Sequence, residues 1–313
     1  MKISLPAPVE DVQIGAAAPA ERAAALELAL GALPKAEREG LVRQALARTG
    51  EQAASEGLFE ARRGGRLAGA LCSELQPGRT AGLWPPQITA AGEPAAEACA
   101  AALIGAALDW LLAREVRIVQ SLLPTDAGRD ADRLRATGFT HPADLLYLVS
   151  DARSFPTAQG NSGLSFQGAA ERGDAELAKL VEATYEQTLD CPSLNGVQDC
   201  GDVLAGYRAT SSFDPSRWFV ARHSGLDVGC LLLADIADAN QWLLVYMGLL
   251  PAARGRGLGI ELVRHAQWLC GQAGRARMVL AVDAENAPAV EIYAAAGFVA
   301  WDRRSVWLRV LDR

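Results

Sequence analysis

The sequence predicts an α/β (α+β) fold in which two copies of one domain follow each other, each a mixed, mostly antiparallel twisted sheet flanked by helices. Three observations support this prediction: the length of the chain, an internal repeat, and the order of apolar segments in the second half. The chain has 313 residues, and domains of about 100–200 residues make two domains the natural expectation. Apolar residues make up 50% of the chain and charged residues 21%, which is typical of a globular protein with a large core.

The internal repeat relates the two halves of the chain. Short matches lie at nearly one offset: Gly69 with Gly229 at 160 residues, Trp110 with Trp268 at 158, and Gly138 with Gly297 at 159. A period of half the chain indicates a tandem duplication. Residues 154–163 read SFPTAQGNSG, and this Ser, Gly and Pro content is typical of a linker. We therefore expect domains at 1–153 and 164–313, joined by a linker at 154–163.

The second half shows the order of elements most clearly. Apolar Leu177, Leu180 and Val181 recur at helical spacing and predict a helix over 174–189. A Pro- and Gly-containing segment over 191–201 predicts a loop. The further expected elements are strands over 218–222, 228–235, 242–250, 277–282 and 298–311, a helix ending at 272 and a helix over 287–296. Early hairpins followed by a strand–turn–helix–strand unit indicate an α/β domain.

The turn Arg254-Gly255-Arg256-Gly257-Leu258-Gly259 follows an apolar strand and opens a helix. Backbone N–H groups at a helix start carry partial positive charge and form an anion site. Glycines remove the side chains that would keep a phosphate away from that backbone. The turn therefore predicts a pyrophosphate-binding loop.

Two nucleotide-binding motifs fail on spacing. A P-loop needs Gly-Lys-Ser/Thr, but Gly259 is followed by Ile260 and Glu261. A dinucleotide fingerprint that starts at Gly255 needs glycine at the position of Ile260. The loop therefore indicates another phosphate-bearing ligand.

The pattern Arg254, Gly257 and Gly259 after a strand resembles the pyrophosphate loop of the GNAT family of N-acetyltransferases. A later helix carries Asn286 near its start and Tyr293 two turns on, as in the family, and the resemblance covers about 164–311. It implies a tandem GNAT arrangement and an acyltransferase that uses acetyl-CoA as cosubstrate, with no metal.

The resemblance also implies roles for individual residues. The cofactor-binding residues expected from it are Leu249, Leu250, Arg254, Gly255, Arg256, Gly257, Leu258, Gly259 and Asn286. Leu249 and Leu250 are expected to offer free backbone N–H groups to the pantetheine and the acetyl carbonyl, as an oxyanion site does. Asn286 also fits a helix N-cap. Tyr293 is the expected catalytic residue, because its phenol can protonate the departing thiolate.

The general base stays open at this point. The stretch 242–246 has no carboxylate, although some family members carry a Glu there. The candidates are Asp190, Glu186, Asp283, Glu285 and Tyr246, and a chain of water molecules is equally plausible. His265 is expected on a helix surface.

The N-terminal copy lacks every one of these functional residues. At the repeat offsets, the positions of Arg254, Gly257 and Gly259 are taken by Ala96, Cys99 and Ala101, while Asn286 and Tyr293 become Ala127 and Leu134. The residues expected to pack in the core are kept, whereas the residues expected to bind the cosubstrate or to catalyse the reaction are replaced. Residues 1–153 are therefore expected to form a degenerate GNAT-like domain.

Bulk properties restrict the partners. The net charge of −7 disfavours a nucleic-acid ligand. The scattered cysteines resemble buried residues of a reducing compartment. We see neither a signal-peptide core nor an apolar run near the roughly 18 residues of a membrane span, so we expect a cytoplasmic protein, monomer or homodimer. Its expected function is N-acetyl transfer to a primary amine of a small molecule, aminoacyl group or peptide; the alternative is a non-catalytic acyl-CoA-binding regulatory module.

Overall fold

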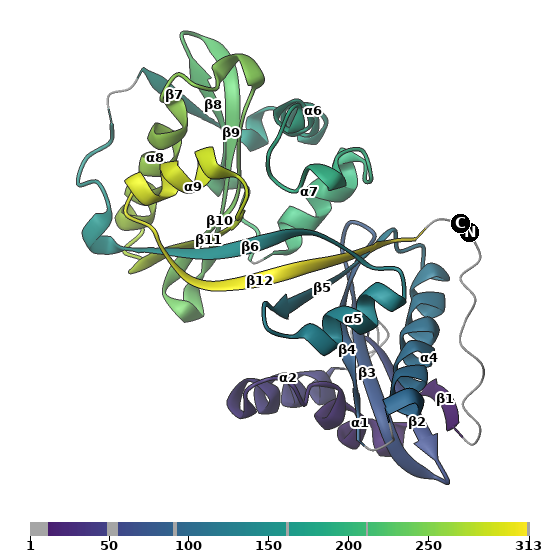
Figure 1. The fold of residues 1–313 in the computed structure, drawn as a ribbon. Helices are drawn as coiled ribbons and strands as arrows, with labels where there is room; N and C mark the ends of the chain where they lie inside the picture. Colours follow the sequence, from purple (N-terminus) through teal and green to yellow (C-terminus); the bar gives the residue numbers. More distant parts are fainter. Residues whose placement is uncertain (1–11, 49–55, 90–92, 161–162, 211, 312–313) are drawn as a thin grey trace. The chain divides into compact units, whose positions relative to one another are not determined.

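The computed structural model describes residues 12–48, 56–89, 93–160, 163–210 and 212–311. Parts of the expected linker, at residues 161–162, and the first eleven residues of the chain lie outside this description. The chain forms two compact units (Figure 1). Unit 1 is Met1–Pro142 together with Ser305–Arg313, and unit 2 is Ala143–Arg304.

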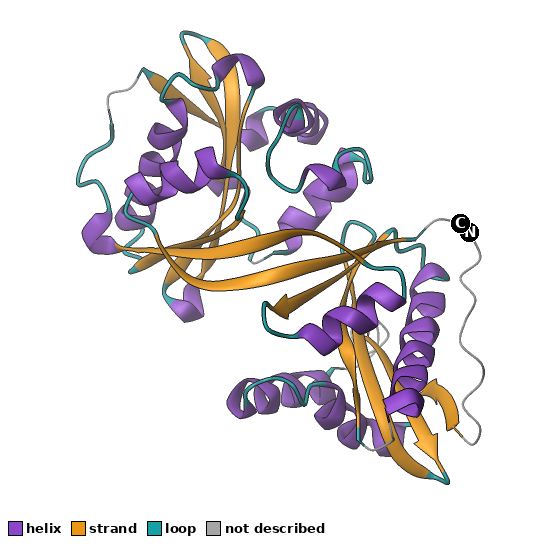
Figure 2. Cartoon of the chain, viewed as in Figure 1, coloured by secondary structure: helices purple, strands orange, loops and turns teal. Residues whose placement is uncertain are grey.

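Unit 1 is a sheet covered by helices on both faces (Figure 2). Its strands are β1 (Val12–Ala16), β2 (Glu56–Arg63), β3 (Arg66–Gln76), β4 (Thr80–Ile88) and β5 (Ile118–Pro124). Its helices are α1 (Arg22–Ala29), α2 (Lys35–Ala47), α4 (Glu93–Leu112) and α5 (Gly128–Ala136). The strands follow in the order β1-β2-β3-β4-β5, and the second half of β12 (Val299–Val310) lies next to β5. Neighbouring strands are antiparallel except β4 and β5, which are parallel.

Unit 2 repeats this plan. Its strands are β7 (Leu164–Gly168), β8 (Trp218–His223), β9 (Leu226–Ile236), β10 (Gln241–Leu249) and β11 (Arg277–Asp283), with most of β6 (Thr140–Asp151). Its helices are α6 (Asp174–Tyr185), α7 (Cys200–Ala209), α8 (Leu258–Gln272) and α9 (Ala287–Ala295). The order is β6-β11-β10-β9-β8-β7, and the first half of β12 lies on the outer side of β6. Only β10 and β11 are parallel among the pairs recorded in the described residues.

Each unit is completed by a strand from the other half of the chain. Within unit 2, β6 pairs antiparallel with β11 from Leu145 to Asp151. Within unit 1, Trp307 and Leu311 of the chain's last segment are buried in the core. The predicted domains at 1–153 and 164–313 follow the chain order, whereas the compact units depart from that order at these two strands.

Alternating side chains bury both faces of each sheet. In β9, Leu231 and Leu233 face the core under α8, while Cys230 and Leu232 face the core under α6 and α7. Successive side chains of a strand point to opposite faces, so residues two positions apart share a face. Both faces are apolar because both are covered by helices, and the site described below uses both layers.

The repeat glycines have the same structural role in both units. A Cβ on Gly229 would lie 2.1 Å from the carbonyl oxygen of Gly248 on the neighbouring strand, and a Cβ on Gly69 would lie 2.7 Å from Ile88. Gly138 and Gly297 have φ of +84° and +81°, and each follows the end of a helix, where a left-handed residue is favoured.

Three expectations need correction. The helix predicted over 174–189 ends at Tyr185, and the loop predicted over 191–201 gives way to α7 at Cys200. The segment Pro94–Leu112 is long and apolar enough to cross a membrane by length and composition, contrary to the expectation that no segment approached that length. Its apolar residues, including Leu103 and Leu111 at 0% exposure, belong to the core of unit 1, so α4 packs as a core helix does.

Candidate functional site

The parallel strands β10 and β11 of unit 2 separate after their first paired residues, and we call the place where they separate the wedge. The two parallel strands pair only at their first three positions, from Gln241↔Arg277 to Leu243↔Val279. The register of β10 with β9 shifts between Leu244 and Tyr246. A bulge of this kind bends a strand and increases its twist. The second half of β10 therefore leaves β11, and its edge toward β11 is unpaired.

Backbone groups on the open edge of β10 differ from the expectation at one residue. The N–H of Leu250 donates to the carbonyl of Val228 at 2.9 Å, so it is not free as expected. Because successive N–H groups of a strand alternate in direction, the N–H of Leu249 points to the opposite side, into the wedge. Of the two leucines, Leu249 thus keeps the geometry of a backbone donor.

The glycine turn, residues 254–259, follows this strand, and we call its backbone the cradle. Gly255 and Gly257 have φ of +70° and +74°, which glycine adopts without strain. A Cβ at either position would meet no atom within 4 Å. The backbone N–H groups of Gly255, Arg256 and Gly257 have no recorded acceptor among the described residues, and α8 begins at Leu258 with further unpaired N–H groups.

Gly259 has a different role from the other loop glycines. A Cβ at this position would lie 2.8 Å from Cδ1 of Ile292 in α9. The glycine therefore permits the close approach of α8 and α9, and this packing places α9 beside the cradle.

Arg254 holds the cradle in place with its side chain. Its guanidinium donates to three carbonyls: Leu249 at 3.1 Å, Gln187 at 3.1 Å and Thr184 at 2.8 Å. These acceptors fix the loop to the end of β10 and to the segment that follows α6. Because its guanidinium donates to these three carbonyls, the side chain of Arg254 stabilises the position of the loop.

Tyr293 and Asn286 occupy α9 at the positions expected for them. The carbonyl of the Asn286 side chain accepts from the N–H of Ala289 at 3.4 Å and caps the helix. Tyr293 is 6% exposed and packs edge-on against Phe298. Its hydroxyl has no hydrogen-bond partner among the described residues. Burial, followed by the nearby charge of Asp190, raises the pKa of the phenol, so Tyr293 carries its proton at neutral pH.

A strap formed by residues 184–191 reaches from β10 to β11. At its start, the hydroxyls of Thr184 and Tyr246 are hydrogen bonded at 2.8 Å. At its end, the N–H of Cys191 donates to Oδ2 of Asp283 at 3.1 Å, and the N–H of Asp283 donates to Oδ1 of Asp190 at 3.1 Å. Gln187 and Cys191 have φ of +54° and +43°, which non-glycine residues adopt only in sharp turns.

The other candidate bases lie in different environments. The ring of Tyr246 stacks on Tyr207 at 5.2 Å between centroids, and burial raises the pKa of its phenol, so it is a core residue under α6 and α7. Glu186 and Glu285 are exposed. Asp283 is 2% exposed and its two oxygens accept the N–H groups of Glu285 and Cys191.

His265 is buried, contrary to the expectation of a surface position. It is 7% exposed, and its ring stacks on Phe166 with 3.6 Å between centroids. Burial lowers its pKa to about 4. This histidine belongs to the aromatic packing around α8. Among the described residues, no group of three His, Cys, Asp or Glu side chains is placed to hold a metal ion, and the six cysteines are free.

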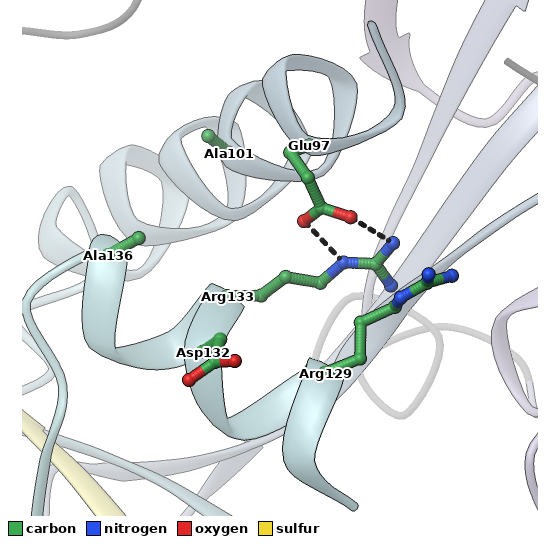
Figure 3. Close-up of a pocket in the computed structure, with 6 residues that line it drawn as sticks. All are labelled: Glu97, Ala101, Arg129, Asp132, Arg133 and Ala136. Carbon is green, nitrogen blue, oxygen red and sulfur yellow. Dashed lines mark hydrogen bonds and ion pairs between the residues drawn. The ribbon is translucent and has the colours of Figure 1, made fainter. Parts of the chain in front are cut away.

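Unit 1 contains the matching wedge between β4 and β5, where the side chain of Arg133 binds a backbone carbonyl of β4. Its parallel strands β4 and β5 also pair at three positions only, Thr80↔Ile118 to Gly82↔Gln120. Arg133 of α5 is 8% exposed and donates to the carbonyl of Pro86 on β4 at 3.1 Å. The same guanidinium forms two bonds to Glu97 of α4, at 2.9 and 3.0 Å. Figure 3 shows this pair across the two helices.

A pocket of about 490 Å³ lies next to the Arg133–Glu97 pair, and it is lined by Glu97, Ala101, Arg129, Asp132, Arg133 and Ala136 (Figure 3). It lies between α4 and α5, with charged side chains of both signs on its walls. Two of its lining residues, Glu97 and Ala101, correspond at the offset of 158 to Gly255 and Gly259, which are predicted functional residues of unit 2.

Comparison with known proteins supports the assignment of unit 2. Residues 181–298 match the profile of the Acetyltransferase (GNAT) family. Mycothiol acetyltransferase of Renibacterium salmoninarum is 27% identical over 191 residues, 58% of this chain and 51% of that protein. Mycothiol acetyltransferase of Mycolicibacterium gilvum is 29% identical over 174 residues, 52% of this chain and 54% of that protein. The matched part of this chain thus spans about half the length of these curated relatives.

Solved structures share the fold of the whole chain. A GCN5-related N-acetyltransferase from Sphaerobacter thermophilus matches with a TM-score of 0.61 at 18% identity, over 96% of each chain. A tandem GNAT protein from the clavulanic acid biosynthesis pathway matches with a TM-score of 0.50 at 16% identity, over 96% of this chain and 99% of that chain. These matches confirm the predicted fold of two tandem domains, and the layout resembles that of mycothiol synthase. The segment that matches the Acetyltransferase (GNAT) family, residues 181–298, lies within unit 2.

Proposed function

We propose that this protein transfers an acetyl group from acetyl-CoA to a primary amine of a small molecule, aminoacyl group or peptide by direct attack. The observation that carries the proposal is the continuous arrangement of cradle, open strand edge and Tyr293 in unit 2. The cradle fits a pyrophosphate because its N–H groups are unpaired and a Cβ at Gly255 or Gly257 would meet only open space. Among the residues expected to bind the cosubstrate, Leu250, Arg254 and Asn286 have backbone N–H groups that already donate within the chain.

The residues of unit 2 divide the chemistry among them. The N–H groups of 255–259 hold the pyrophosphate, and Arg254 keeps their loop in position. Asn286 sets the start of α9 by capping it. The N–H of Leu249 donates to the pantetheine or to the oxyanion that forms at the thioester carbonyl. Tyr293, protonated because its pKa is raised, donates its proton to the thiolate that leaves.

Thiol release tests the proposal. The protein is incubated with acetyl-CoA and a panel of amines that includes an amino sugar, an alkylamine, an amino-acid amide and a peptide. We expect release with at least one amine, and a fall of about 100-fold in kcat in Tyr293→Phe, within the usual range of general acid catalysis. Tyr147→Phe is the matched control, since Tyr147 packs against Trp301 away from the wedge.

Two outcomes separate enzyme from binding module. Acetyl-CoA binding without thiol release for any amine would favour the regulatory module. Unchanged kcat in Tyr293→Phe would show that the phenol takes no part in the reaction, and the proposal of acetyl transfer would still stand. A cytoplasmic location and a monomeric or homodimeric state belong to the same proposal.

A further inference from the structure

Asp190 lies at the point where the strap meets β11. Its Oδ1 accepts the N–H of Asp283 at 3.1 Å, and its own N–H donates to the hydroxyl of Thr188 at 3.0 Å. The first bond positions the carboxyl group and the second positions the backbone of Asp190, while the residue as a whole remains exposed. Oδ2 has no recorded partner among the described residues and is available to a ligand.

The phenol of Tyr293 is close enough to Asp190 for the charge of that carboxylate to act on it. Tyr293 is 6% exposed and its hydroxyl has no hydrogen-bond partner among the described residues, while the charge of Asp190 acts on its phenol. The hydroxyl is not among the fully buried polar atoms without a partner, so it is accessible to a ligand that approaches the phenol. Tyr293 thus reaches the wedge from α9 and Asp190 from the strap.

We propose that Asp190 is the general base that takes the proton from the ammonium group of the acceptor. This inference rests on the proposed acetyl transfer and supplies the residue that the sequence left open. Of the carboxylates considered there, Asp283 has both oxygens engaged by backbone N–H groups. Glu186 and Glu285 are exposed, and neither is among the charges that act on the phenol of Tyr293.

The surroundings of Asp190 suit a base. Burial of its carboxyl raises the pKa, the N–H of Asp283 lowers it, and the like charge of the Asp283 side chain raises it further, with a net rise. The titratable groups that interact electrostatically with it are Asp283 of β11, Tyr293 of α9, Tyr246 of β10, Tyr185 of α6 and its neighbour Cys191. No cation is among the groups acting on it, so the carboxylate keeps its basicity.

The proposed step balances as follows. The carboxylate of Asp190 accepts one proton from the ammonium group and releases it to solvent at its exposed edge. The free amine forms the C–N bond at the thioester carbonyl, and the C–S bond breaks as the oxyanion collapses. Tyr293 gives its proton to the thiolate, and the second proton leaving the amide nitrogen restores the phenol through solvent.

Two acceptors of different basicity test the role of Asp190 in Asp190→Asn. Ethanolamine is protonated at pH 7 and needs a base, whereas hydroxylamine is a neutral nucleophile at this pH and needs none. The asparagine keeps an oxygen that accepts the N–H of Asp283, so the strap retains its contact. We expect kcat with ethanolamine, or with a faster alkylamine of the panel, to fall about 100-fold, and kcat with hydroxylamine to change by less than about threefold.

The pH profile and controls complete the experiment. In the wild type the rate with the alkylamine is expected to rise through the pKa of Asp190, and this rise should be absent in Asp190→Asn. Glu182→Gln removes the same charge from exposed α6 and should match the wild type. Equal loss with both acceptors, or loss in Glu186→Gln instead, would overturn the role of Asp190. A wild type that releases no thiol with any acceptor would contradict the proposed function itself.

Discussion

The wedges of the two units have the same backbone plan and opposite contents. In both, two parallel strands pair at three positions and then separate. In unit 2 the opening is lined by a free strand edge and a glycine cradle. In unit 1 the corresponding part of β4 carries Pro85 and Pro86, which have no N–H to donate. The guanidinium of Arg133 donates a hydrogen bond to the backbone carbonyl of Pro86.

The helix that follows each wedge explains the rest of the difference. At the repeat offset of 158, the cradle position Gly255 corresponds to Glu97, which lies inside α4. The longer helix of unit 1 therefore covers the positions that form a loop in unit 2. At the offset of 159, Ile292 corresponds to Arg133, so a charged pair replaces an apolar contact. The separated strands are a property of the fold, and ligand binding depends on a few residues at their ends.

Breaking the cradle of unit 2 should have the largest effect. In Gly257→Val, a side chain enters a backbone with φ of +74°, and a left-handed non-glycine residue costs about 1–2 kcal/mol. The side chain also stands where the pyrophosphate would lie. We expect acetyl-CoA to bind about 100-fold more weakly, which corresponds to about 2.7 kcal/mol, measured by calorimetry.

A matched control separates strain from lost contact. Gly274 has φ of +70° and open space at its Cβ, but it lies beyond the far end of α8. Gly274→Val should share the strain and keep the affinity. Equal loss of affinity in both variants would show that the cradle is not the binding site.

Opening the wedge of unit 1 should change stability and leave binding unchanged. Arg133→Leu leaves Glu97 without its partner and the Pro86 carbonyl without its donor. We expect the free energy of unfolding to fall by about 1–3 kcal/mol, measured by urea denaturation. Replacing Glu97 by Leu as well should recover part of this loss, since removing both partners can be nearly neutral. A change in acetyl-CoA affinity would contradict the separation of roles.

Acid should affect unit 2 more than unit 1. His265 corresponds to the buried Ala107 at the offset of 158. Its pKa is lowered to about 4 in the folded protein, against about 6.5 when unfolded. Below pH 6.5 the unfolded chain binds the extra proton, so stability falls as pH falls toward 4. We expect a loss of about 1–2 kcal/mol between pH 7 and 5 that His265→Leu lacks; equal slopes in both proteins would refute it.

Local patterns in the sequence predicted several structural features of the candidate site. The glycine turn, the cap by Asn286 and the place of Tyr293 two turns later on the same helix depend on residues close together in the chain, and the repeat showed which copy kept them. These features follow from the conformational limits of glycine and from helical spacing.

Long-range contacts could not be predicted in the same way. The exchange of β6 and β12 between units pairs residues more than a hundred positions apart, as in the Leu145↔Asp283 pair. The bonds of Arg254 to the strap, the engaged N–H of Leu250 and the Arg133 pair all depend on tertiary packing. Nothing in the spacing of these residues indicates their partners.

The number of acetyl-CoA molecules bound per chain tests the central claim most directly. Titration calorimetry of the wild type should give one site, retained in Arg133→Leu and lost in Gly257→Val at the same protein concentration. Two sites per chain, or a full site that remains in Gly257→Val, would contradict the claim that unit 2 alone binds the cosubstrate.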